Sequence, residues 1–132
     1  MGIKPLNKKG EYFRNNVWYW RRLWDFVCLV SDLDEKTHFR GNFNDGLTIT
    51  GIRHREMVKN LELALKSKKD FSSWLRENKK RYEKTNREFL LKFHGKKASK
   101  MTEFNECPYP FSWENVESFL VFVKNNRGFR IW

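Results

Sequence analysis

Aromatic and guanidinium side chains are concentrated in the segment Trp18–Arg22, which reads Trp-Tyr-Trp-Arg-Arg. An arginine beside an exposed aromatic ring can contact a phosphate while the ring stacks on a nucleotide base. Adjacent residues of a helix point in different directions, so we expect Trp20 to face the core. The opposite side of the helix would then present Trp18, Arg21 and Arg22 to a ligand. Core tryptophans with merely solvated arginines are the alternative interpretation.

A second polar cluster lies in the segment Gly41–Gly46, where Asn44 and Asp45 precede Gly46. Asn-Gly and Asp-Gly sequences mark tight turns. The amides and the single carboxylate of this loop are suited to ribose hydroxyls and base N–H groups. The loop lacks the Lys-Ser/Thr of a phosphate-binding loop, and one carboxylate is too few for calcium. A turn in which Asn and Asp satisfy their own backbone is the alternative.

The histidines and cysteines do not have the spacing of a metal site. His38, His54 and His94 are isolated in the sequence, and Cys28 and Cys107 have no second cysteine or histidine at ligand spacing. The acidic residues at 25, 32, 34 and 35 do not single out an acid–base pair. We therefore predict no catalytic residue, no metal and no cofactor.

The chain is strongly basic, with 27 Lys and Arg against 16 Asp and Glu and a formal net charge of +11. The segment Arg53–Lys100 contains 16 of the basic and 6 of the acidic residues, a net charge of +10. A localised positive excess attracts polyanions over long distances. A solvated surface without a partner is the alternative interpretation.

The basic segment contains the longest expected helix, Asp70–His94, in which Asp70 is the cap and Gly95 follows the end. Its apolar side would carry Phe71, Leu75, Tyr82, Phe89 and Phe93. At 100° per residue, the opposite side carries a basic stripe made of Arg76, Lys80, Lys84 and Arg87. We predict that this stripe is a nucleic-acid surface.

Three further helices are expected. The first begins near Asn15 or Asn16 and ends near Ser31, before an acidic segment. The second runs over about Ile52–Ser67 after a Thr50 cap, and the last over Trp113–Asn125 after a Ser112 cap.

The remaining segments predict a small β element. Residues 1–14 are expected to form an extended arm, Leu47–Thr50 a short strand, and Phe129–Trp132 a terminal strand that pairs with one of the two. We therefore predict a mainly α fold of about four helices in one compact domain over 1–132, with an α+β fold as the alternative.

The sequence predicts a cytoplasmic protein. No apolar run approaches the roughly 20 residues needed to span a bilayer, and the segment Met1–Gly10 has no apolar stretch typical of a secretory signal. Two cysteines do not make a disulfide framework. No membrane partner is expected.

The segment Tyr12–Trp24 resembles the opening of a family of small uncharacterised bacterial and phage proteins that reads F-R-N-N-x-W-x-W-R-P-L-W. Members continue with an N-D-G loop, matched by Asn44–Gly46, and end in G-G-F-x-I, matched by Gly128–Ile131. Arg22 stands in place of the family's Pro and Arg127 in place of a Gly, which adds positive charge. The resemblance brings no activity and no catalytic residue. It implies a phage or bacterial cytosolic setting and a meeting of the three segments in space.

Together these patterns predict a non-enzymatic binding protein for an anionic, nucleotide-containing ligand, either nucleic acid or a small nucleotide. The expected site consists of Arg14, Asn15, Trp18, Arg21, Arg22, Asn44, Asp45 and Arg130. In a phage setting such a protein would act in the host cytoplasm against a host defence protein. An inhibitor that occupies a partner's nucleic-acid groove, and a small nuclease or nucleotide hydrolase, are the alternatives.

Overall fold

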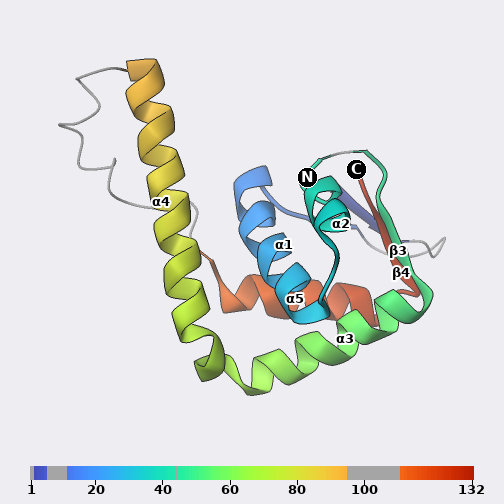
Figure 1. Ribbon diagram of the computed structural model, residues 1–132. Helices are drawn as coiled ribbons and strands as arrows, with labels where there is room; N and C mark the ends of the chain where they lie inside the picture. The colour runs from blue at the N-terminus through green and yellow to red at the C-terminus, as the bar shows by residue number, and fades with distance from the viewer. Residues whose placement is uncertain (1, 6–11, 44, 95–110) are drawn as a thin grey trace. The chain divides into compact units, whose positions relative to one another are not determined.

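The computed structural model describes residues 2–5, 12–43, 45–94 and 111–132 (Figure 1). As predicted, the described chain is mainly α-helical with a small β-sheet. The chain divides into two compact units, one made of 1–67 and 112–132 and the other of 68–111. The second unit is thus an insertion between two segments of the first. A single domain over 1–132 stays a prediction.

The sheet of the first unit contains β1 (Gly2–Pro5), β2 (Phe13–Arg14), β3 (Thr48–Thr50) and β4 (Gly128–Ile131). Its order is β2-β1-β4-β3, and neighbouring strands are antiparallel. The terminal strand therefore pairs with both segments that the sequence offered as its partner. Of the predicted extended arm, Gly2–Pro5 and Phe13–Arg14 are strands, and residues 6–11 lie outside the described residues. The strand β1 lies inside the sheet.

Alternation along the strands gives the sheet one buried and one exposed face. The inner face carries Ile3, Phe13, Ile49, Phe129 and Ile131, all of them buried. The pairing register explains why these side chains share one face, because Ile3 lies opposite both Phe13 and Ile131. Residues directly opposite each other in an antiparallel pair share a face. The residues between them must therefore lie on the outer face.

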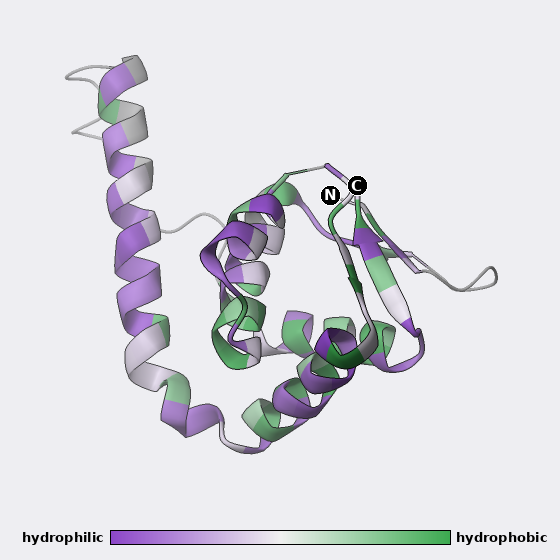
Figure 2. Ribbon diagram, turned by 45° about the vertical axis from the view of Figure 1, so that its right-hand side comes forward, coloured by the Kyte–Doolittle hydropathy of each residue, from purple (hydrophilic) through white to green (hydrophobic). Residues whose placement is uncertain are grey.

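The helices of the first unit are α1 (Val17–Ser31), α2 (Glu35–Arg40), α3 (Gly51–Lys66) and α5 (Trp113–Lys124). Figures 1 and 2 show α1 and α5 on the same side of the sheet. The predicted core residues of α5, Val116, Phe119, Leu120 and Val123, are all buried. Ser112 caps this helix as predicted, because its hydroxyl accepts a hydrogen bond from the Asn115 N–H at 3.3 Å.

Aromatic rings fill the space between these helices and the sheet. Trp20 and Trp24 of α1 are fully buried and stack with ring centroids 5.4 Å apart. Phe119 of α5 meets Trp20 edge-on at 5.7 Å and Phe129 of the sheet at 5.6 Å. Such pairs add about 0.5–1.5 kcal/mol beyond their buried area. The high aromatic content of the sequence is therefore used largely in one core.

The short helix α2 is not among the four helices predicted from the sequence. Tertiary hydrogen bonds explain it, because the Trp24 indole donates to the His38 carbonyl at 2.9 Å and the Trp20 indole to the Gly41 carbonyl at 2.7 Å. Six residues are too few for a stable helix in isolation. The helix before it, α1, ends at Ser31, and the next residue, Asp32, has a positive φ of 49°. The acidic segment after Ser31 is therefore only part of the reason why α1 ends there.

The second unit contains a 3₁₀ helix, η1 (Lys68–Phe71), followed by α4 (Ser72–His94). The predicted cap was wrong, because Asp70 lies within the 3₁₀ turn and α4 begins two residues later. Hydrophilic residues cover most of α4 (Figure 2). Leu75 and Tyr82 of the predicted apolar side are half-buried, whereas the side chains of Phe89 and Phe93 lie outside the described residues.

Gly41 packs directly against the indole of Trp24. A Cβ atom on this residue would collide with the indole of Trp24. We expect Gly41→Ala to lower the free energy of unfolding by about 1–3 kcal/mol, because α2 must shift away from α1. Urea denaturation measures this change. Gly2→Ala is the matched control, because its Cβ would meet only the Trp132 carbonyl oxygen at 3.8 Å. Equal stability of the two variants would contradict the packing described.

Candidate functional site

The outer face of the sheet carries large basic and aromatic side chains from three strands. Lys4 lies on β1 opposite Arg130 of β4, and Arg14 lies on β2 opposite Gly2. Tyr12 and Trp132 flank β2 and β4 at alternating positions and are 53% and 43% exposed. We call the set Lys4, Tyr12, Arg14, Arg130 and Trp132 the basic-aromatic face.

Cations and rings alternate across this face. The Lys4 ammonium lies 5.3 Å from the centroid of the Trp132 ring and 5.9 Å from that of Tyr12. The Arg14 guanidinium lies 5.9 Å from the Tyr12 ring, and that of Arg130 lies 5.9 Å from the Trp132 ring. A ring face attracts a cation within about 6 Å, so these contacts hold the five side chains as one layer.

Neighbouring groups fix two members of the layer. The Arg130 Nε donates to the Thr48 hydroxyl at 3.1 Å, which orients the guanidinium along the sheet. The Trp132 backbone exchanges hydrogen bonds of 2.9 and 3.0 Å with Gly2. Its ring lies near Gly46, where a Cβ atom would be 3.7 Å from the indole. Gly46 has a φ of +85°, as the predicted tight turn requires.

The loop thus reaches the terminal strand, as the sequence analysis expected. The Gly46 N–H donates to the Ile131 carbonyl at 3.0 Å. The Asp45 carboxylate accepts from the Leu47 N–H and from the Arg40 Nε, both at 3.2 Å. The observed arrangement is therefore a turn that satisfies its own backbone, next to the sheet edge. Asn44 lies outside the described residues.

The residues predicted on α1 do not join this layer. Arg22 is buried with 2% exposure, contrary to the prediction that it lies on a solvated side. The reason is that α1 is enclosed over most of its circumference, and Leu23 and Trp24 beside Arg22 are also buried. Arg21 is half-buried. The side chain of Trp18 lies outside the described residues.

Asn15 bonds to another helix instead of facing the loop. Its side-chain amide and that of Asn115 donate to each other at 3.0 and 2.7 Å. This reciprocal pair joins the segment before α1 to the first turn of α5. Because the two amides bond to each other, Asn15 has a structural role that requires no ligand. Of the eight residues predicted for the site, Arg14 and Arg130 lie on the basic-aromatic face, and Asp45 lies at its border.

Sequence reasoning missed Lys4, Tyr12 and Trp132. The signal that identifies them is alternation. Each is the chain neighbour of an apolar residue whose side chain is buried beneath the sheet, namely Ile3, Phe13 or Ile131. Alternation over two to four residues is too short to be recognised without knowing which segments pair. The pairing of strands distant in sequence supplies that information.

The basic stripe lies on α4, in the second unit. Arg76, Lys80, Lys84 and Arg87 are all exposed, as predicted. Their spacing extends the stripe over about 16 Å at 1.5 Å per residue. Glu83, next to Lys84, pairs with Lys79 at 3.9 Å, which partly offsets the charge. The stripe is a positive surface whose four members include no aromatic residue.

The described residues contain no group of three or more His, Cys, Asp or Glu that could hold a metal ion. Cys28 is buried in α1, and burial, with Asp25 and Asp34 nearby, raises the pKa of its thiol far above the usual range. One unpredicted pair joins α1 to α2, since His38 Nε2 lies 2.7 Å from the Asp25 carboxylate. Within the part that the structure describes, no helix is long and apolar enough to cross a membrane.

No protein-family model, curated protein or solved structure matches this chain. The resemblance to small bacterial and phage proteins therefore stays a prediction.

The reciprocal asparagine pair makes a prediction about stability. We expect Asn15→Ala to lower the free energy of unfolding by about 1–2 kcal/mol, because the half-buried amide of Asn115 loses its partner. Adding Asn115→Ala should cost less than the sum of the single changes, with a coupling of at least about 0.5 kcal/mol. Urea denaturation of the four proteins measures the coupling. Strict additivity would show that the two amides do not depend on each other.

Proposed function

We propose that this protein binds single-stranded nucleic acid on its basic-aromatic face and does so without catalysing a reaction. The observation that carries the proposal is the alternation of three cations with two exposed rings on one face of the sheet. Proteins that bind single strands combine a positive surface for the backbone with aromatic rings on which bases stack. Three cations and two rings are enough to contact a few nucleotides in this way.

The energies favour bases on the rings. A cation above an exposed ring contributes about 0.5–1 kcal/mol, whereas stacking of one base contributes about 1–3 kcal/mol. A base can therefore displace Lys4 from the Trp132 ring, and the released ammonium can contact the adjacent phosphate. The faces of bases in a duplex are already stacked on each other. The rings thus favour a single strand, and the cations on either side of them favour its backbone.

The sheet gives these contacts a rigid support. Neighbouring strands lie about 4.8 Å apart, so side chains on β2, β1 and β4 form successive rows. Backbone hydrogen bonds fix the rows, and the Trp132 ring is further limited by Gly46. Pre-ordered side chains lose less entropy when a ligand binds. A small nucleotide would engage one ring, whereas a strand would engage both.

The stacking part of the proposal predicts an effect of Trp132→Leu, which keeps an apolar side chain but removes the ring. We expect the Kd for a fluorescent twelve-nucleotide single strand, measured by anisotropy, to rise about 5- to 100-fold. Phe39→Leu is the matched control, because Phe39 is 66% exposed on α2 and outside the face. An equal loss in both variants, or no loss in Trp132→Leu, would refute stacking on this face. If a mononucleotide bound as tightly as the single strand, the ligand would be a small nucleotide instead of a strand.

The electrostatic part predicts the salt dependence of binding. Three phosphate contacts should give a slope of about −2 in a plot of log K against log salt, since each contact on a single strand contributes about −0.7. Arg130→Gln should make the slope shallower by about 0.7. Lys59→Gln on α3 is the matched control, because it removes one exposed charge outside the face. A slope that changes only on neutralising the basic stripe of α4 would move the site to that helix.

A further inference from the structure

A charged pair lies at the border of the basic-aromatic face. The Asp45 carboxylate accepts a hydrogen bond from the Arg40 Nε at 3.2 Å, and the Arg40 and Asp45 side chains are 42% and 41% exposed. An exposed ion pair contributes little to the stability of a fold. A ligand can therefore reach both side chains, and either can be replaced without unfolding the protein.

The turn that carries Asp45 lies against the ring of Trp132. The Gly46 N–H donates to the Ile131 carbonyl at 3.0 Å, and a Cβ atom on Gly46 would lie 3.7 Å from the six-membered part of the indole. Figures 1 and 2 show the segment between α2 and β3 passing beside the C-terminus. Asp45 directly precedes Gly46, so a base stacked on Trp132 has this turn beside one of its edges.

Both members of the pair have hydrogen-bonding capacity beyond the contacts described. An ionised carboxylate offers about four lone-pair sites. The Leu47 N–H and the Arg40 Nε occupy two of those of Asp45. A guanidinium has donors on its terminal nitrogens as well as on Nε, and the bond to Asp45 uses Nε. The pair thus presents donors directly beside acceptors.

Guanine is the base whose edge complements this order. Its Watson–Crick edge carries one acceptor, O6, followed by two donors, N1–H and the N2 amine. The acceptor suits a guanidinium N–H, and the two adjacent donors suit a carboxylate. Adenine carries a donor and then an acceptor in the first two places. It would therefore set a donor against the guanidinium and a lone pair against the carboxylate.

We infer that the Arg40–Asp45 pair gives the basic-aromatic face a preference for guanine, with the base stacked on Trp132 and its Watson–Crick edge on the pair. The preference rests on the proposed function, because it concerns one base of the single strand bound there. A carboxylate repels a phosphate, so Asp45 suits a base edge and not the backbone. The cations of Lys4 and Arg130 remain for the phosphates.

The affinity for three single strands tests the preference. Each is a fluorescent twelve-nucleotide thymine strand in which every third base is guanine, hypoxanthine or adenine, and anisotropy gives its Kd. These purines have the same two-ring frame, so stacking on Trp132 differs little between them. We expect the guanine strand to bind about 5- to 100-fold more tightly than the adenine strand. Hypoxanthine, which lacks the N2 amine, should lie between them.

Two substitutions assign the preference to the carboxylate. Asp45→Asn keeps an oxygen for the Leu47 N–H but replaces one acceptor by a donor. The ratio of the adenine Kd to the guanine Kd should therefore fall toward one. Asp70→Asn is the matched control, because it removes one exposed carboxylate in the second unit and should leave the ratio unchanged.

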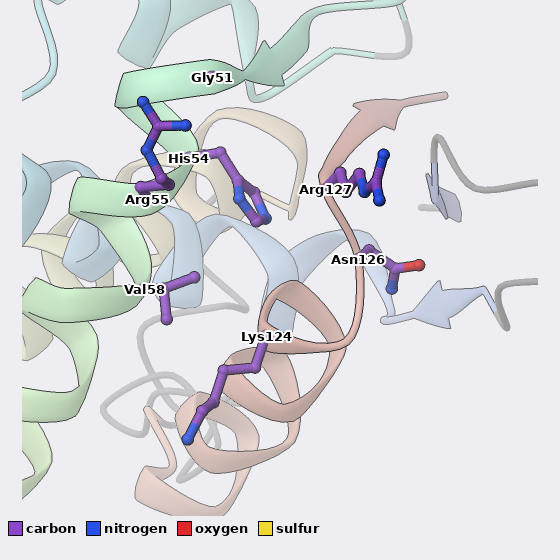
Figure 3. A pocket seen from close by; sticks show the side chains of 7 residues that line it. All are labelled: Gly51, His54, Arg55, Val58, Lys124, Asn126 and Arg127. Carbon is purple, nitrogen blue, oxygen red and sulfur yellow. The ribbon is translucent and has the colours of Figure 1, made fainter.

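Arg40→Gln tests the guanidinium in the same way, and it should also lower the ratio because the O6 atom of guanine loses a charged donor. Arg127→Gln is the matched control. Arg127 is exposed and directly precedes β4, at the end of the strand opposite to Trp132. Figure 3 shows its side chain directed away from α3, at the rim of a pocket whose lining residues are outside the face.

Trp132→Leu distinguishes a failure of the preference from a failure of the strand site. Equal Kd values for the guanine and adenine strands, both raised in Trp132→Leu, would overturn the guanine preference and leave the strand site intact. A guanine preference that persists in Asp45→Asn would overturn the role of the pair. No binding of any of the three strands would overturn both proposals.

Discussion

The first unit depends on the insertion of β4 between β1 and β3. One short strand, Gly128–Ile131, joins the N-terminal segment to the middle of the chain through antiparallel hydrogen bonds. Its inward residues, Phe129 and Ile131, are fully buried in the aromatic core. Its outward residue, Arg130, belongs to the basic-aromatic face, where its guanidinium lies 5.9 Å from the centroid of the Trp132 ring. The same strand therefore contributes to both the core and the exposed layer.

Much of the fold follows from sequence periodicity. The long helices were predictable because their apolar residues recur at helical spacing, as in Val116, Phe119 and Val123. The terminal strand and its two candidate partners were predictable from alternation and turn residues. The helix α2 was not, because two buried indole donors and the His38–Asp25 pair stabilise it from outside its own sequence. Such contacts cannot be predicted from the helix propensity of the segment itself.

The site was harder to predict than the fold. Arg14 and Arg130 were identified from their residue types, but Lys4 lies beside them only because two strands more than a hundred residues apart are paired. Arg22 shows the opposite error, since a charged type suggested exposure and the packing of α1 buries it. Residue type indicates which chemistry is available, whereas long-range pairing decides which residues share a surface.

The position of β4 also has a consequence for the order of folding. The sheet is incomplete until residue 131 has been synthesised, because β1 contacts β3 only through β4. Until then Ile3, the inner residue of β1, has no central partner strand. The insertion Lys68–Phe111 separates α3 from α5 in the sequence. Lengthening such an insertion costs little, because loop-closure entropy grows only with the logarithm of length. The contacts themselves remain distant in sequence, which slows folding. The first unit is thus completed only after the residues of α4 have been synthesised.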